Sequence, residues 1–154
     1  MAHNSRLIRG ARVNDVFAVL SDGWTYSDWV VGTRKIREVE PGWPQAGSAI
    51  HYTAGHWPLR KDDITESVQY EPERRLELEA HAWPAGTAGI VLRAEQVSDG
   101  VVVTIDEAPK SGLLRAVHNP ALDLLIRLRN VETLRRFEQQ VRQAQRGSLR
   151  TASG

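Results

Sequence analysis

The sequence predicts an α+β fold in which a curved antiparallel sheet of about seven strands wraps around a long C-terminal helix. Three observations carry this prediction. Residues 33–108 alternate apolar and polar side chains with a period of two, short turns separate the successive strands, and the rest of the chain returns to helical spacing. Strands joined by short turns pair antiparallel, because parallel neighbours need a crossover of a dozen or more residues.

The chain is expected to open with an edge strand over residues 5–8, and two short helices then separate strands 1 and 2. Four apolar residues recur at helical spacing in the first helix: Val13, Val16, Phe17 and Leu20. Residues 21–23, Ser-Asp-Gly, end this helix. The second helix places Tyr26 and Trp29 on one face before Gly32 ends it.

Six further strands are expected, separated by turn signals such as Pro41-Gly42 and Asp99-Gly100. Their ranges are 33–40, 48–54, 59–69, 74–83, 87–97 and 101–108. The alternation assigns twelve residues to the covered face of the sheet: Ile50, Tyr52, Ile64, Val68, Leu76, Leu78, Ala80, Ile90, Leu92, Val101, Val103 and Ile105. The opposite face is mostly polar, as in a sheet with one side in water.

A long helix in the C-terminal part of the chain is expected to cover this face. Its apolar residues follow the 3.6-residue period: Val117, Ala121, Leu124, Leu128, Val131, Leu134 and Val141. Because proline breaks a continuous helix, Pro120 predicts a kink or a fresh start near Asn119. We expect a single domain over residues 1–146 and a disordered tail over 147–154, where no apolar period remains.

Composition excludes several classes of function. The 154 residues include 20 Lys and Arg against 19 Asp and Glu, and the net charge of +1 is too small to hold nucleic acid. The chain contains no cysteine, which excludes disulfides and thiolate metal sites. No histidine pair has zinc spacing and no phosphate loop is present, so we expect neither a metal nor a cofactor. Without a signal peptide or an integral membrane segment, the protein is expected to be cytoplasmic.

The aromatic residues are concentrated in segments that would rim a space between sheet and helix: Trp24, Tyr26, Trp29, Trp43, Tyr52, Trp57 and Trp83. Such walls suit a large apolar ligand, and core packing is the alternative for each residue. Trp29 and Tyr52 are the favoured walls. The covered faces of sheet and helix add four aliphatic residues to the expected lining: Leu78, Val103, Leu124 and Leu128.

The polar candidates are histidines and carboxylates near the ends of predicted strands. His56 and His118 are placed at the mouth of a pocket, whereas His51 and His81 share a side with polar residues and are expected to face solvent. Glu66 shares its side with Ile64 and is expected to point inward, where burial would raise the pKa of its carboxyl. The other carboxylates near sheet ends are Asp62, Asp63, Asp106 and Glu107, for which surface charge is the alternative.

Several segments together resemble the START-like or SRPBCC superfamily, especially bacterial members of the polyketide cyclase/dehydrase and lipid-transport type. They are VFAVLSD, YSDWVVG, AGSAIHY, HWPL, YEPERRLEL, EAPKSGLL and NPALDLLIRLRNVETLRRF, and the resemblance covers residues 5–145. It implies the helix-grip fold, with a deep pocket between the concave sheet and the C-terminal helix and with the two short helices as its cap. It implies no single chemistry, since members bind lipids, hormones, quinones or polyketides and some catalyse cyclisation or dehydration.

The expected function is therefore binding of a small hydrophobic ligand, such as a lipid, a quinone or a polyketide-like molecule, with no assigned reaction. The alternative is a polyketide aromatase/cyclase or dehydratase, which needs at least two polar groups converging inside the cavity. A third class, an interaction module, would require a large exposed apolar patch. The oligomeric state stays open between monomer and homodimer.

Overall fold

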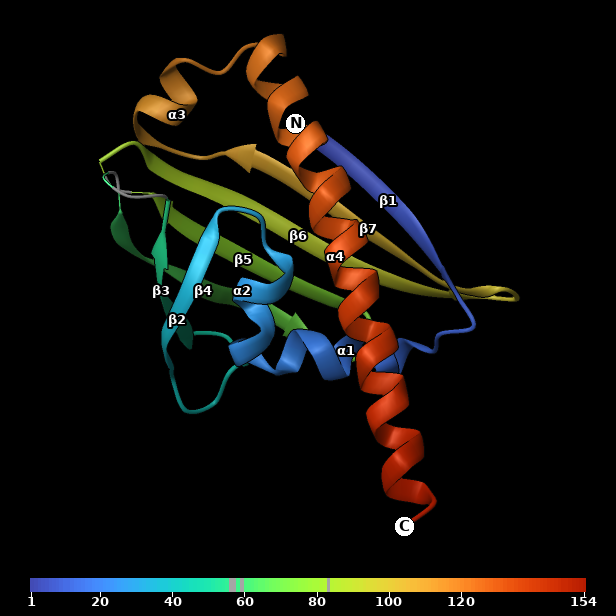
Figure 1. Ribbon diagram of the computed structural model, residues 1–154. Helices are drawn as coiled ribbons and strands as arrows, with labels where there is room; N and C mark the ends of the chain where they lie inside the picture. The colour runs from blue at the N-terminus through green and yellow to red at the C-terminus, as the bar shows by residue number, and fades with distance from the viewer. Residues whose placement is uncertain (56–57, 59, 83) are drawn as a thin grey trace.

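The computed structural model describes residues 1–55, 58, 60–82 and 84–154. Within these residues, seven strands form one antiparallel sheet in the order β1-β7-β6-β5-β4-β3-β2. Their bounds are β1 Ala2–Arg9, β2 Thr33–Val39, β3 Ala49–Ala54, β4 Lys61–Glu71, β5 Arg75–Ala82, β6 Gly86–Val97 and β7 Gly100–Pro109. Each strand from β2 to β6 pairs with its successor, and the N-terminal strand β1 pairs with β7 at the edge of the sheet (Figure 1). This arrangement confirms the predicted fold class.

The connection between β1 and β2 contains α1 (Val13–Ser21), a single 3-10 turn η1 (Gly23–Thr25) and α2 (Tyr26–Trp29). Their apolar residues are buried at the positions that helical spacing predicted, with Val16, Phe17 and Leu20 on α1. Strand β1 is longer than expected, because its ladder with β7 runs from Ala2 opposite Glu107 to Arg9 opposite Gly100.

The long helix α4 (Pro120–Ala152) makes a fresh start after the short helix α3 (Gly112–Ala116). The Asn119 side chain caps α4 by accepting a hydrogen bond from the Leu122 amide, and Pro120 occupies the first turn, where its missing N–H has no cost. The helix continues through residues 147–152, where the sequence predicted a disordered tail, and the side chains of these residues are exposed. None of the helices among the described residues is both long and apolar enough to cross a membrane.

Two glycines hold α3 against the end of the sheet. A Cβ atom on Gly86 would lie 2.0 Å from the Ser111 carbonyl oxygen, and one on Gly112 would lie 2.6 Å from the Gly86 Cα. Both residues also have positive φ angles, which glycine adopts without strain. The start of β6 and the start of α3 therefore approach backbone to backbone, and the Leu114 amide donates a hydrogen bond to the Ala85 carbonyl at 2.8 Å.

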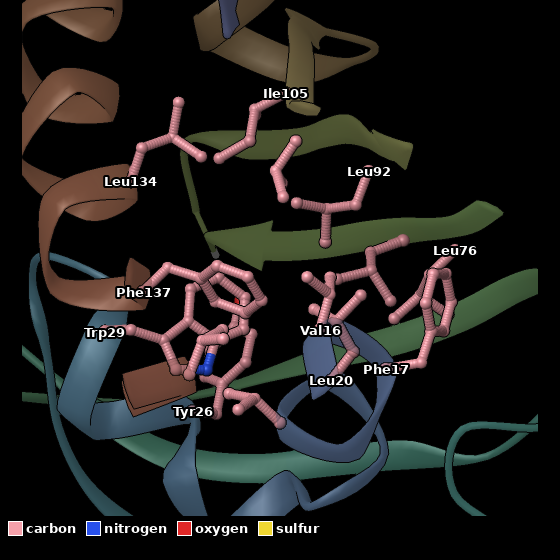
Figure 2. Close-up of a cluster of buried hydrophobic side chains, with 14 of the residues drawn as sticks. Val16, Phe17, Leu20, Tyr26, Trp29, Leu76, Leu92, Ile105, Leu134 and Phe137 are labelled. Atoms are coloured by element: carbon pink, nitrogen blue, oxygen red, sulfur yellow. The ribbon is translucent and has the colours of Figure 1, made fainter. Parts of the chain in front are cut away.

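The core fills the space between the sheet and the second half of α4. Figure 2 shows Leu134 and Phe137 of α4 facing Leu92 and Ile105 of the sheet, with the side chains of α1 and α2 closing the cluster from the other side. The Trp29 ring packs edge-on against Phe137, with 5.0 Å between ring centroids. The residues of this part of the interface belong to one cluster of buried hydrophobic side chains.

The first half of α4 presents a different face to the sheet from the one predicted. Leu124, Leu128 and Val131 are exposed by 56%, 60% and 54%, so the placement of this stripe against the sheet was wrong. The inward stripe keeps the helical period but includes polar residues: Leu122, Ile126, Arg129, Asn130, Thr133, Leu134, Phe137 and Val141. Polar residues can occupy this inward face because their side chains form hydrogen bonds with other parts of the protein. Thr133, for example, accepts a hydrogen bond from the Val31 amide.

The predicted faces of β4 are also reversed. Thr65 lies opposite Ile50 in the ladder and is fully buried, whereas Val68 is exposed. Residues directly opposite each other in an antiparallel pair share a face, so Ile64 and Glu66 belong to the outer side. The Thr65 and Ser67 side chains satisfy their hydroxyls internally, which is why polar residues occupy the covered face of this strand.

Candidate ligand cavity

A cavity of about 310 Å³ lies between the concave face of the sheet and the first half of α4. Most of its walls are apolar, and the residues from the helices and strands include Val30, Ala80, Ile90, Leu114, Leu122 and Ile126. A smaller recess shares five lining residues with it and extends to Trp29 and Leu78. A hollow of this size with a few polar groups has the character of a small-molecule site.

The hollow exists because inward side chains become smaller toward one end of the sheet. Along β5 the inward residues change from Leu76 and Leu78 to Ala80, and along β6 they change in the same direction from Leu92 and Ile90 to Ala88. Leucines fill the end beneath the second half of α4. At the other end of the sheet, beneath the first half of α4, the smaller alanine side chains leave space. The cavity lies in this space.

Three hydroxyl groups form a hydrogen-bonded row at the floor of the cavity. Thr65 Oγ1 donates to the Tyr52 phenol oxygen at 3.2 Å, and because that uses its only hydrogen, the Tyr26 phenol donates to Thr65 at 3.2 Å. Burial raises the pKa of the Tyr26 phenol above its usual value, and it raises the pKa of the Tyr52 phenol as well. Both phenols therefore stay protonated and uncharged at neutral pH.

A charged cluster joins the sheet to α4 beside this row. Arg129 Nη2 donates to Glu107 Oε2 at 2.5 Å, and Asn130 Nδ2 donates to the same oxygen at 3.1 Å. Arg129 Nη2 also donates to Asn130 Oδ1 at 3.2 Å. The buried Glu107 carboxylate thus neutralises the guanidinium on the cavity wall, and the whole cluster fixes the rotation of α4 about its axis.

Asp63 of β4 and His81 of β5 complete the polar lining. Asp63 Oδ1 lies 3.9 Å from Lys61 Nζ, and its side chain is mostly buried. His81 was expected to face solvent. It lies opposite Ile64 on the outer face of the sheet, as expected, and stays partly exposed at the edge of the cavity, with Glu79 Oε1 at 4.0 Å from its Nε2. No group of three or more histidines, aspartates or glutamates among the described residues is arranged to hold a metal ion.

The structure brings together four of the ligand-binding residues that the sequence predicted. Tyr26 and Tyr52 line the cavity, while Trp29 and Leu78 line the recess beside it. Trp57 lies outside the described residues, as do His56 and Trp83.

Five other predicted ligand-binding residues lie elsewhere. Leu124 and Leu128 point to solvent, and Glu66 is on the outer face of β4. His118 is exposed before α4 and bonds to Asp123 at 2.8 Å. Val103 faces inward as predicted, but it lies in the filled part of the core, because its end of β7 is covered by the second half of α4.

The sequence analysis missed the inner residues of α4 and the hydroxyl of Thr65. A partial signal existed for Glu107, which shares the side of Val103 and Ile105 on β7 and was named only as a carboxylate near a sheet end. Arg129 gave no comparable signal, since it lies in an arginine-rich helix whose charges are typical of a solvated face.

No family model matches the sequence, and no curated protein is similar to it. Solved structures with the same fold do match. One is a protein from Nitrosomonas europaea, which is 15% identical, with a TM-score of 0.68 over 92% of this chain and 93% of that one. Another is Ara h 8.0201, which is 12% identical, with a TM-score of 0.66 over 90% of this chain and 95% of that one.

The di-domain ARO/CYC StfQ from the steffimycin biosynthetic pathway matches as well, at 11% identity and a TM-score of 0.69. The alignment covers 92% of this chain and 50% of StfQ, so the chain corresponds in length to about half of that protein. The fold is therefore the helix-grip fold, as the sequence predicted.

Proposed function

We propose that this protein binds a small, largely apolar molecule in the cavity between the sheet and the first half of α4. The observation that carries the proposal is the hollow of about 310 Å³, whose walls are mostly aliphatic and whose few polar groups are already held by hydrogen bonds. Apolar area removed from water supplies the affinity, and the polar groups set the orientation of the ligand. The ligand class includes quinones, polyketide-like molecules and lipids.

The fold neighbours support this proposal in general terms. StfQ is described as an ARO/CYC of a biosynthetic pathway, and it uses the same architecture of sheet and helix. In the helix-grip fold, the concave sheet face and the long helix enclose space that neither element fills alone. In this chain the alanines of β5 and β6 keep that space open.

The neutral fluorescent probe N-phenyl-1-naphthylamine is expected to bind with saturation at one site per chain. The substitution Ala80→Phe would place a ring inside the cavity and should weaken probe binding at least tenfold, because the ring occupies the volume that the probe needs. Fluorescence titration measures both constants. Leu128→Phe makes a comparable change on the exposed face of α4 and should leave the constant unchanged. Equal affinity in native protein and Ala80→Phe would reject the cavity as the binding site.

A second candidate is an aromatase/cyclase or dehydratase reaction in the same cavity. The observation that favours it is that two polar groups lie on one hollow: the neutral Tyr52 phenol, which suits stabilisation of an enolate oxygen, and the Asp63 carboxylate, which can accept a proton. In the first step, the Asp63 carboxylate takes a proton from the carbon beside a ketone, and the electron pair of the broken C–H bond moves to the carbonyl oxygen.

This second candidate predicts faster proton exchange at a bound ketone. In D₂O, the methyl protons of 2-acetylnaphthalene should exchange about a hundredfold faster with the protein than in buffer, as followed by proton NMR. Exchange at the buffer rate, at ketone concentrations that saturate the cavity, would leave binding as the function and exclude this chemistry.

A further inference from the structure

The outer face of the first half of α4 carries an apolar stripe that is exposed to solvent. Its four large side chains are exposed by 54% to 64%: Leu124, Leu125, Leu128 and Val131. Spacings of three and four residues place these side chains on one face of the helix. Single exposed leucines are common on soluble proteins, whereas a continuous group on one helix indicates a surface that binds another molecule.

The outer face becomes polar and basic after the apolar stripe ends. Beyond Val131 the same face continues with Arg135, Gln139 and Arg146, which are all exposed. If two copies of α4 paired in parallel, each of these arginines would lie beside its own equivalent, and like charges at that distance repel. An antiparallel pair instead brings the two apolar stripes together and directs the arginine-rich halves of the helices away from each other.

One antiparallel register buries the whole stripe. A two-fold axis between Leu124 and Leu128 sets Leu124 of each copy against Leu128 of the other. The next layer on either side then pairs Ala121 with Val131 of the second copy, and Leu125 lies beside its equivalent near the axis. Every layer of this contact is apolar, as in the seam of an antiparallel coiled coil.

The charges beside the stripe match in the same register. Within the described part of the chain, the Arg127 guanidinium makes no ion pair or hydrogen bond, and it borders a shallow depression of about 320 Å³ that Asp123 also lines. The antiparallel pair brings Arg127 of one copy to the depression of the other, within reach of the Asp123 carboxylate. Asp123 already binds the Met1 amino group and His118, and the four acceptor positions of a carboxylate leave room for another donor.

We propose that two copies of this chain associate through the outer faces of α4, as an antiparallel helix pair in which Arg127 of each copy binds Asp123 of the other. The stripe and its flanks amount to roughly 500 Å² per copy, so the pair buries about 1,000 Å², at the small end of specific interfaces. Such a dimer is expected to dissociate at concentrations on the order of 10 µM. The inference does not rest on the proposed function, because the cavity lies on the opposite side of α4.

Sedimentation equilibrium tests the association. Between about 1 and about 200 µM, the measured mass is expected to rise from 17.2 kDa towards twice that value. Leu124→Arg places a charge inside the apolar contact and should raise the dissociation constant at least a hundredfold. Gln143→Arg is the matched control, because it adds the same charge to an exposed position of α4 beyond the stripe and should leave the constant unchanged. Both variants should unfold at the native urea midpoint at about 1 µM, where the chains are monomeric.

A pair of charge-reversed variants tests the register. Arg127→Asp alone sets two carboxylates against each other at both ends of the contact, and Asp123→Arg alone does the same with two guanidinium groups. Each variant should therefore associate about tenfold more weakly than the native chain. When the two variants are mixed, both ion pairs form again with reversed polarity, so the mixed dimer should recover near-native affinity. Native mass spectrometry distinguishes this mixed dimer from the two self-pairs by mass.

Three results would overturn the inference. One is a mass of 17.2 kDa at every concentration, which would mean that the native chain is a monomer. Another is a dimer that Leu124→Arg leaves intact, which would place the interface on a different surface. The third is a monomer that binds phosphatidylglycerol vesicles and loses this binding with Leu124→Arg, which would assign the stripe to a lipid surface. Preferential formation of the mixed dimer from the two charge-reversed variants supports the antiparallel register directly.

Discussion

Replacing Glu107 with alanine is expected to lower the free energy of unfolding by about 3 kcal/mol. The Glu107 carboxylate is buried and accepts hydrogen bonds from Arg129 and Asn130. Its removal leaves the guanidinium and the amide without this acceptor at the junction of β7 and α4. An unpaired buried charge typically costs about 3–5 kcal/mol, and the partial exposure of Arg129 places this case at the lower end. Urea denaturation at pH 7 measures the loss.

Two companion variants show whether the loss comes from the stranded charge. Glu107→Gln keeps an oxygen that accepts from Arg129 and Asn130, so it should lose less stability than alanine. The double variant Glu107→Leu with Arg129→Met removes both charges and should recover most of the stability, since apolar replacements of a buried pair are often neutral. A Glu107→Ala protein within about 0.5 kcal/mol of native would contradict the assigned role of the cluster.

The sequence predicted the order of elements because the signals for them are local. Alternation identified the strands, glycine and proline identified their turns, and the helical spacing of Val16, Phe17 and Leu20 identified α1. These patterns depend on neighbours in the chain, so they survive without knowledge of tertiary contacts. The Asn119-Pro120 pair predicted the start of α4 for the same reason, since a cap and a first-turn proline act locally.

The sequence did not predict the inner face of α4, because tertiary contacts decide which side of this helix faces the sheet. Two stripes of this helix follow the same period, and the one with Leu124 and Leu128 is the more apolar. The other stripe faces the sheet because Arg129 and Asn130 find Glu107 there and Thr133 finds the Val31 amide. Hydrogen-bond partners on distant elements therefore place the less apolar stripe of α4 against the sheet. The pattern of a single sequence contains no information about those partners.

The same polar residues give the cavity its chemistry. An entirely apolar stripe would leave a ligand free to adopt many orientations, whereas Arg129 and the row of hydroxyls offer donors in fixed positions. The features that misled the prediction of faces, Thr65 on β4 and Arg129 on α4, are therefore the ones that distinguish this cavity from a simple hydrophobic core. The exposed leucines that the pattern favoured instead form an apolar surface on the outer side of α4.

Replacing Phe137 with alanine is expected to lower the free energy of unfolding by about 4 kcal/mol, the other large effect among the variants. The Phe137 ring is almost fully buried and packs edge-on against Trp29, so its removal leaves a cavity between α4 and α2 that the backbone cannot close. Leu128→Ala on the same helix removes an exposed side chain and should change stability by less than about 0.5 kcal/mol. Chemical denaturation of both variants therefore measures which face of α4 is buried. Equal losses would mean that the helix is rotated relative to the sheet, and Arg129 would then no longer lie on the cavity wall.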